Sequence, residues 1–178
     1  SPLPGRPSSA TVRSGMGDIA FWVFGAGTIT MSGTSAYDNR STSASNNAGT
    51  GTLVFTGASP TWSQANSNAD PYNFRFNGSG TISTTTTRVG CTNQLRVSAG
   101  TLTPSVAITA VTSYLVDGGT LTWNSASNVQ AAIVASSGTL NITVNDTFTG
   151  AQTWSGATVA LAATTQTFSA AVTASGGS

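Results

Sequence analysis

The sequence has no lysine, no glutamate and no histidine, and its single cysteine is Cys91. Because lysine and glutamate are favoured on exposed helix surfaces, their absence argues against a helical protein. Most general-base, triad and zinc chemistries lose their usual residues when histidine and glutamate are missing, so we predict that the protein is not an enzyme. A lone cysteine cannot form a disulfide within the chain, and we expect it to be a small buried side chain.

Charge and long hydrophobic runs are also scarce. Six arginines and five aspartates give the 178 residues a net charge of +1. So small a charge provides no general attraction to nucleic acid or to an anionic membrane. The strongest apolar run, Ile19–Phe24, is much shorter than the ~18 residues that span a bilayer. We therefore expect neither a nucleic-acid partner nor a membrane span.

The sequence is rich in serine and threonine, with 56 such residues, and it contains a repeat. The repeat is a Gly-Thr-aliphatic triplet, and successive triplets are 24, 29, 20, 19, 19 and 18 residues apart. The triplets begin at Gly27, Gly51, Gly80, Gly100, Gly119 and Gly138, with a degenerate copy at Gly156. An apolar residue precedes each later glycine by two to four positions: Phe76, Val97, Val116, Val134 and Trp154.

This spacing predicts an all-β fold. A glycine at a fixed position fits a tight corner, and the threonine and aliphatic residues that follow favour a strand. A strand–corner–strand unit of about 19 residues is typical of one coil of a parallel β-helix, or β-solenoid. A β-sandwich or jelly roll remains an alternative, because it also has regularly spaced strands and turns. The predicted structural corners are Gly80, Gly100, Gly119, Gly138 and Gly156.

The predicted organisation has two parts. Residues 1–14 form an extended proline-rich arm, and residues 15–178 form a single β domain. Within that domain, residues 15–79 are irregular coils with insertions and a lid strand, and residues 80–178 are regular coils.

The triplets of residues 80–175 resemble the repetitive β-helical passenger regions of autotransporter-type and filamentous-haemagglutinin-like surface proteins. The resemblance implies a secreted surface structure. It implies no site residues.

The predicted ends of the column suggest self-assembly. Strand-like residues continue through Leu161, Phe168 and Val172, and no charged or helical cap follows them. An uncovered solenoid end exposes backbone groups and an apolar cross-section, which a second copy could cover head to tail. The predicted interface residues lie at both ends: Pro2, Pro4, Pro7, Phe21, Trp22, Phe24, Phe168 and Val172.

The aspartates and arginines suggest no active site. Asp38, Asp70, Asp117 and Asp146 each neighbour asparagine, proline or glycine, so we expect turn roles for them. Arg88 and Arg96 are expected to be solvated or paired with aspartates of another subunit. No cofactor or metal is predicted.

Four Asn-X-Ser/Thr motifs make glycosylation a candidate modification at Asn39, Asn77, Asn141 and Asn145. The sequence as a whole predicts a structural subunit that assembles with copies of itself into an extracellular filament or a cell-surface coat. Two alternatives remain: a virion structural protein (phage tail fibre, spike or capsid decoration) and a carbohydrate-binding adhesin module, for which glycans would be partners.

Overall fold

A computed structural model describes residues 26–32, 36–39, 50–64, 70–84, 89–104, 106, 108–109, 112–125, 131–163 and 165–178. All regular elements in these ranges are β-strands. They are β1 (Thr28–Met31), β2 (Ala36–Asn39), β3 (Thr52–Phe55), β4 (Thr61–Gln64), β5 (Asn73–Thr84), β6 (Val89–Gly90), β7 (Gln94–Leu102), β8 (Ile108–Thr109), β9 (Ser113–Trp123), β10 (Ala132–Ile142), β11 (Asp146–Phe148), β12 (Gln152–Trp154), β13 (Thr158–Leu161), β14 (Gln166–Phe168) and β15 (Val172–Ala174).

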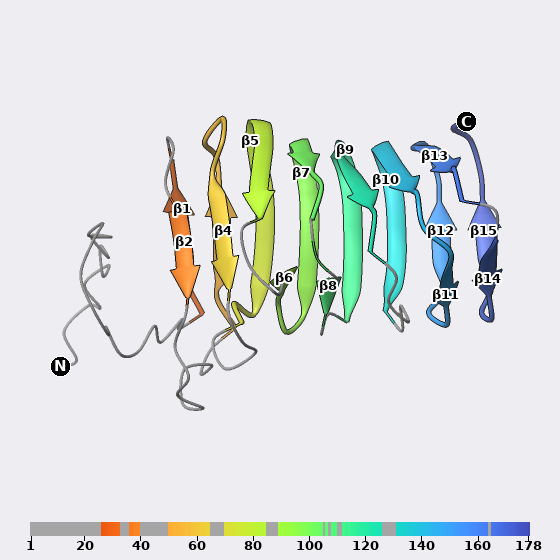
Figure 1. Ribbon diagram of the computed structural model, residues 1–178, viewed down its shortest axis with the longest axis horizontal. Helices are drawn as coiled ribbons and strands as arrows, with labels where there is room; N and C mark the ends of the chain where they lie inside the picture. Colours follow the sequence, from red (N-terminus) through yellow and green to blue (C-terminus); the bar gives the residue numbers. More distant parts are fainter. Residues whose placement is uncertain are drawn as a thin grey trace, which may run out of the picture.

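These strands form a parallel β-solenoid of about five turns. The main sheet has the strand order β1-β3-β5-β7-β9-β10-β12-β15, so each coil lies beside the next along the column (Figure 1). Every pairing between described strands is parallel. The solenoid prediction is confirmed. The sandwich or jelly-roll alternative is wrong, because those folds are built from antiparallel strands.

The regular triplets lie in register along this column. Thr81 is paired with Thr101, and Thr101 with Thr120. Thr120 is paired with Thr139, and Thr139 with Thr158. The result is one row of threonines across five successive strands, which face away from the core because strand side chains alternate in direction. The coil repeat inferred from the sequence is therefore the actual stacking period of this part of the column.

The first two triplets occupy a different position in the coil. Thr28 is paired with Thr52, but Thr52 is paired with Asn73 and not with Thr81. The 29-residue step between Gly51 and Gly80 is therefore not one coil with an insertion. It combines a complete coil from Thr52 to Asn73 with a shift to another part of the next coil.

Aliphatic side chains fill the interior in rows that run along the column. The third residues of the regular triplets, Ile82, Leu102, Leu121 and Leu140, are paired in order and buried. A second row passes through Phe76, Val97, Val116 and Ala135 to Trp154. Val134, predicted from the sequence to belong to that row, is half-buried, and Ala135 takes the core position.

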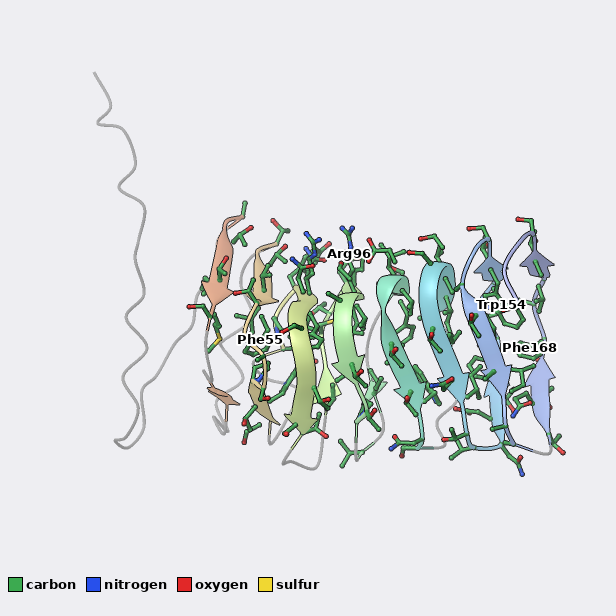
Figure 2. All side chains as sticks on the ribbon, turned by 90° about the horizontal axis from the view of Figure 1, so that it is seen from above. Phe55, Arg96, Trp154 and Phe168 are labelled. Atoms are coloured by element: carbon green, nitrogen blue, oxygen red, sulfur yellow. The ribbon has the colours of Figure 1, made fainter. Side chains whose placement is uncertain are left out.

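Aromatic side chains add to both halves of the core. Phe55, Trp62 and Phe74 form one cluster, with 3.9 Å between the ring centroids of Trp62 and Phe74. Further along, the rings of Tyr114 and Trp123 meet edge to face at 5.0 Å. Figure 2 shows Phe55 in the first part of the column and Trp154 and Phe168 near its other end. Cys91 is buried in the same core.

The corner glycines lie where neighbouring coils approach most closely. Gly100 and Gly138 have φ values of 63° and 79°, a region that side chains rarely adopt. A Cβ atom on Gly138 would lie 2.2 Å from the carbonyl oxygen of Gly119 in the preceding coil. Atoms this close cannot be accommodated without moving the backbone. The same close approach to the preceding coil holds at Gly80, Gly119 and Gly156.

Candidate functional site

The C-terminal coil carries the exposed large hydrophobic side chains of the described structure, Leu161 and Val172. Core rows that are fully covered elsewhere end here on exposed side chains. Ile142 is completely buried, whereas its partner in the next coil, Leu161, is 44% exposed. Val172, which continues the row through Ile133 and Gln152, is 42% exposed. The cross-section of the core is therefore open at this end.

Strand edges are open at the same end. In the described structure, β13 is paired with β10, β14 with β11 and β15 with β12, each on one side. The residues after β15 cover part of the β13 edge, because the backbone N–H of Val159 donates to the carbonyl oxygen of Ser178 at 2.8 Å. For β14 and β15, no other described strand pairs with the outer edge. Such edges are templates for pairing with another strand.

Phe168 lies where this open end meets the core. Its ring stacks on Phe148 at 5.1 Å and meets Trp154 edge to face at 5.8 Å (Figure 2). Two polar atoms nearby are buried without a hydrogen-bond partner in the described structure: Oε1 of Gln152 and Nε1 of Trp154. Each such atom costs about 1–3 kcal/mol.

The structure places only part of the predicted interface. Phe168 and Val172 both lie in the C-terminal coil. The other predicted interface residues and the lid strand fall outside the described residues: Pro2, Pro4, Pro7, Phe21, Trp22 and Phe24. The predicted arm, residues 1–14, also lies outside them. Leu161 is exposed at the same end but was not among the predicted interface residues, although its place after Ile142 in a 19-residue repeat could have identified it as the end of a core row.

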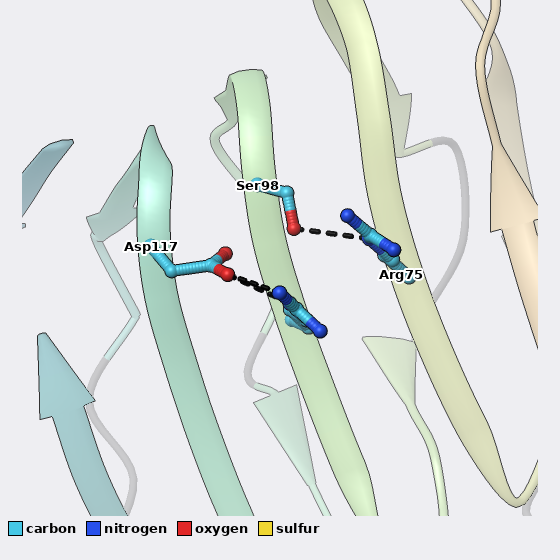
Figure 3. Close-up of polar contacts among 4 residues, drawn as sticks. Arg75, Ser98 and Asp117 are labelled. Carbon is cyan, nitrogen blue, oxygen red and sulfur yellow. Dashed lines mark hydrogen bonds and ion pairs between the residues drawn. The ribbon is translucent and has the colours of Figure 1, made fainter. Parts of the chain in front are cut away.

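A charged cluster lies on the side of the column, away from the open end. Arg75 on β5 is paired in register with Arg96 on β7, and both side chains alternate with buried core residues. Nε of Arg96 donates to Oδ2 of Asp117 at 2.9 Å, and Nε of Arg75 donates to Oγ of Ser98 at 3.0 Å. Figure 3 shows these side chains facing one another across successive coils.

Both charged residues of this pair differ from their predicted roles. Arg96 was expected to be solvated or paired across subunits, but it forms an ion pair with Asp117 within the chain. Asp117 was expected in a turn, and it lies inside β9. Partial burial raises the pKa of Asp117, but the hydrogen bond and charge of Arg96, aided by Ser98 and Arg75, outweigh it and lower the pKa below its usual value.

This lowered pKa predicts an acid-dependent loss of stability. An unfolded aspartate titrates near ~3.9, and the folded pKa of Asp117 is lower. Its stabilising contribution is therefore complete above the unfolded value and disappears as the pH falls through the folded one. We expect Asp117→Asn to cost about 1 kcal/mol at pH 7, because the pair is partly exposed, and to cost nothing in acid. Urea denaturation of the wild-type protein and the Asp117→Asn variant, from pH 7 down to a pH below the folded pKa of Asp117, measures the difference in stability.

The matched control is a double-mutant cycle with Arg96→Gln. If Arg96 causes the effect, Asp117→Asn should change stability little in the Arg96→Gln background. A stability difference between the wild-type protein and the Asp117→Asn variant that is the same at every pH would contradict the ion-pair explanation.

The candidate glycosylation sites are scattered over the column. Asn77 and Asn145 are exposed, and Asn141 is half-buried. Nδ2 of Asn141 donates to Oγ1 of Thr122 at 3.4 Å. The side chain of Asn39 lies outside the described residues.

The remaining charged residues with predicted roles are far apart in the sequence. Asp38 lies within β2 and Asp146 begins β11, so neither has the turn position that was expected. Asp146 accepts a hydrogen bond from Nε1 of Trp123 at 2.9 Å. Asp70 is buried just before β5. Arg88 lies outside the described residues.

The described residues contain no cluster of three or more His, Cys, Asp or Glu side chains that could hold a metal ion. The hollow beside Pro104, Ile108 and Trp123 is too shallow to enclose even a water molecule, so it does not resemble the ligand pockets of known proteins. Within the described ranges, no helix is long and apolar enough to cross a membrane.

No family model, curated protein or solved structure matches this chain at a significant level. The function must therefore be inferred from the column itself.

Proposed function

We propose that this protein is a non-enzymatic structural subunit that assembles head to tail into a filament or coat. The observation that supports this most directly is the C-terminal coil, where Leu161 and Val172 are exposed although the core rows they extend are buried. A second copy seated there would bury these side chains and continue the rows. It would also pair the outer edges of β14 and β15, which have no strand partner in the described structure.

The proposed acceptor is the opposite end of another copy. β1, at the start of the described column, is paired with β3 on one side. An interface between two different ends is heterologous, so it repeats in one direction and produces an open filament unless the rotation closes a ring. The predicted N-terminal interface residues would contribute to this contact.

The low net charge of +1 supports the proposal physically. If a charged residue occupied the same position in successive coils, like charges would lie one strand spacing apart and repel each other. Low net charge also weakens the long-range repulsion that keeps proteins monomeric. We propose an extracellular or cell-surface location for the assembly. A virion fibre or coat would use the same contacts.

Placing charges on the open end should abolish assembly. We expect Leu161→Asp combined with Val172→Asp to raise the critical concentration at least about 100-fold, because uncompensated buried charges cost several kcal/mol each. Sedimentation velocity and negative-stain microscopy of both proteins measure this. Wild-type protein should form regular polymers whose axis follows the column.

The matched control carries the same two charges on the side of the column. Thr101→Asp combined with Thr139→Asp changes two outward-facing threonines in non-adjacent coils. This variant should assemble like the wild type. The proposal is wrong if wild-type protein remains monomeric at high concentration, or if the lateral variant loses assembly as completely as the end variant.

A further inference from the structure

Two arginines in adjacent coils lie side by side in a chain that otherwise avoids stacked charge. Arg75 and Arg96 are register partners on β5 and β7, so their Cα atoms are separated by roughly the ~4.8 Å strand spacing. Like charges directly opposite in a sheet destabilise it. They are the only arginines in the described part of the chain. Their alignment therefore requires a compensating partner.

Asp117 forms a hydrogen-bonded ion pair with only one of them. It forms the ion pair with Arg96, whereas the hydrogen-bond partner of Arg75 in the described structure is the uncharged hydroxyl of Ser98. Of the other aspartates with described side chains, Asp70 is buried just before β5, and Asp146 accepts a hydrogen bond from Trp123. The face formed by β5, β7 and β9 thus has one excess positive charge. A guanidinium group has five N–H donors, so the hydrogen bond from Nε leaves the outer nitrogens of Arg75 able to bind an anion.

Apart from Arg96 and Asp117, the outward residues around Arg75 on these strands are uncharged, and they form two rows along the column. One outward row contains Val54, Arg75, Arg96 and Leu115, all half-buried. A second outward row, two residues earlier on each strand, contains Thr52, Asn73, Gln94 and Ser113. The second row presents amides and hydroxyls at successive strand spacings. Nε2 of Gln94 donates to Oγ of Ser113 at 3.4 Å, which leaves the amide oxygen of Gln94 as an acceptor.

This combination points to one kind of ligand. We propose that the outward face of β5, β7 and β9 binds an acidic polysaccharide, with the guanidinium of Arg75 holding a sugar carboxylate. The row of amides and hydroxyls would bind sugar hydroxyls along the column, and the aliphatic side chains would contact the apolar faces of the rings. A planar guanidinium matches a carboxylate in a bidentate arrangement.

Charge spacing distinguishes this ligand from other polyanions. Nucleic acids and anionic membranes present dense negative charge, which proteins meet with clusters of many lysines and arginines. A single arginine whose hydrogen bond in the described structure goes to an uncharged hydroxyl fits a polymer with one negative charge per sugar. The inference goes beyond the proposed assembly, because this face lies on the side of the column and does not include the residues of the open end.

The test uses polygalacturonate as the probe, with its fully methyl-esterified form as the uncharged comparison. Isothermal titration should show binding of polygalacturonate that weakens with rising salt and no comparable binding of the ester. Arg75→Gln should weaken binding about tenfold, since it removes one charge-assisted pair. Asp117→Asn should strengthen binding severalfold, because it releases Arg96. Thr139→Asp, which lowers the net charge as much as Arg75→Gln does but lies on another row, should change little.

Three outcomes would overturn the inference: no binding of polygalacturonate, equal binding of the ester, or unchanged binding by Arg75→Gln. Preferential binding of a sulfated polymer such as heparin would overturn the carboxylate assignment. Repeating the titration with the Leu161→Asp/Val172→Asp protein separates this inference from the assembly proposal. We expect the face around Arg75 in that variant to bind polygalacturonate with unchanged affinity even though assembly is lost.

Discussion

Gly138→Val is expected to destabilise the column by about 4 kcal/mol or more. The backbone of Gly138 has a φ of 79°, which a β-branched residue adopts only with strain. Its new side chain would also begin 2.2 Å from the carbonyl oxygen of Gly119. Because that oxygen belongs to the backbone of the preceding coil, rotation of a side chain cannot relieve the clash. The expected result is a failure to fold or a large fall in the urea concentration at the unfolding midpoint, which circular dichroism measures.

Gly27→Val is the matched control. A Cβ atom on Gly27 would have no other atom within 4 Å, and its φ is not in the left-handed region. This variant should lose less than about 1 kcal/mol. Equal losses for the two variants would show that the close approach between coils does not cause the Gly138 effect.

Leu121→Ala should have the second-largest effect, a loss of about 3 kcal/mol. Leu121 is 0% exposed, and its register partners Leu102 and Leu140 are also fully buried. Truncation therefore leaves a cavity between three successive coils, and the rigid sheet limits how far they can collapse into it. Chemical denaturation of the purified variant measures the loss.

Leu115→Ala tests the same change on the opposite face of the same strand. Leu115 alternates with buried residues of β9 and is half-buried on the outer surface. Its truncation should cost under about 1 kcal/mol, because water can occupy the vacated space. If Leu115→Ala proves as damaging as Leu121→Ala, the assignment of inward and outward rows in β9 is wrong.

The solenoid was predictable from sequence because its central coils repeat both residue type and phase. Thr101, Thr120 and Thr139 recur at 19-residue steps, and each is the register partner of the next. The first coils could not be aligned in the same way. Thr52 is the threonine of a triplet like the others, yet it stacks on Asn73, and nothing in the local sequence distinguishes its place in the coil.

The charged face could not be predicted for a related reason. Arg75, Ser98 and Asp117 belong to three different coils. Ser98 and Asp117 each lie two residues before a corner glycine, but the residue types do not repeat from coil to coil. Register between coils, fixed by packing of the core, determines which outward residues meet. Asp117 lies two residues beyond Leu115, the register partner of Arg96, so the ion pair joins diagonal neighbours on β7 and β9 and not paired positions.

The constant register of Thr101, Thr120 and Thr139 also makes the coil a unit of length. A gain or loss of one complete 19-residue coil keeps the inward rows continuous, because inward residues would still be paired with inward residues of the neighbouring coil. The column would become longer or shorter by one strand spacing, ~4.8 Å, while both end surfaces stayed as they were. The length of the column can therefore change during evolution in steps of one coil, with no substitution needed at either end.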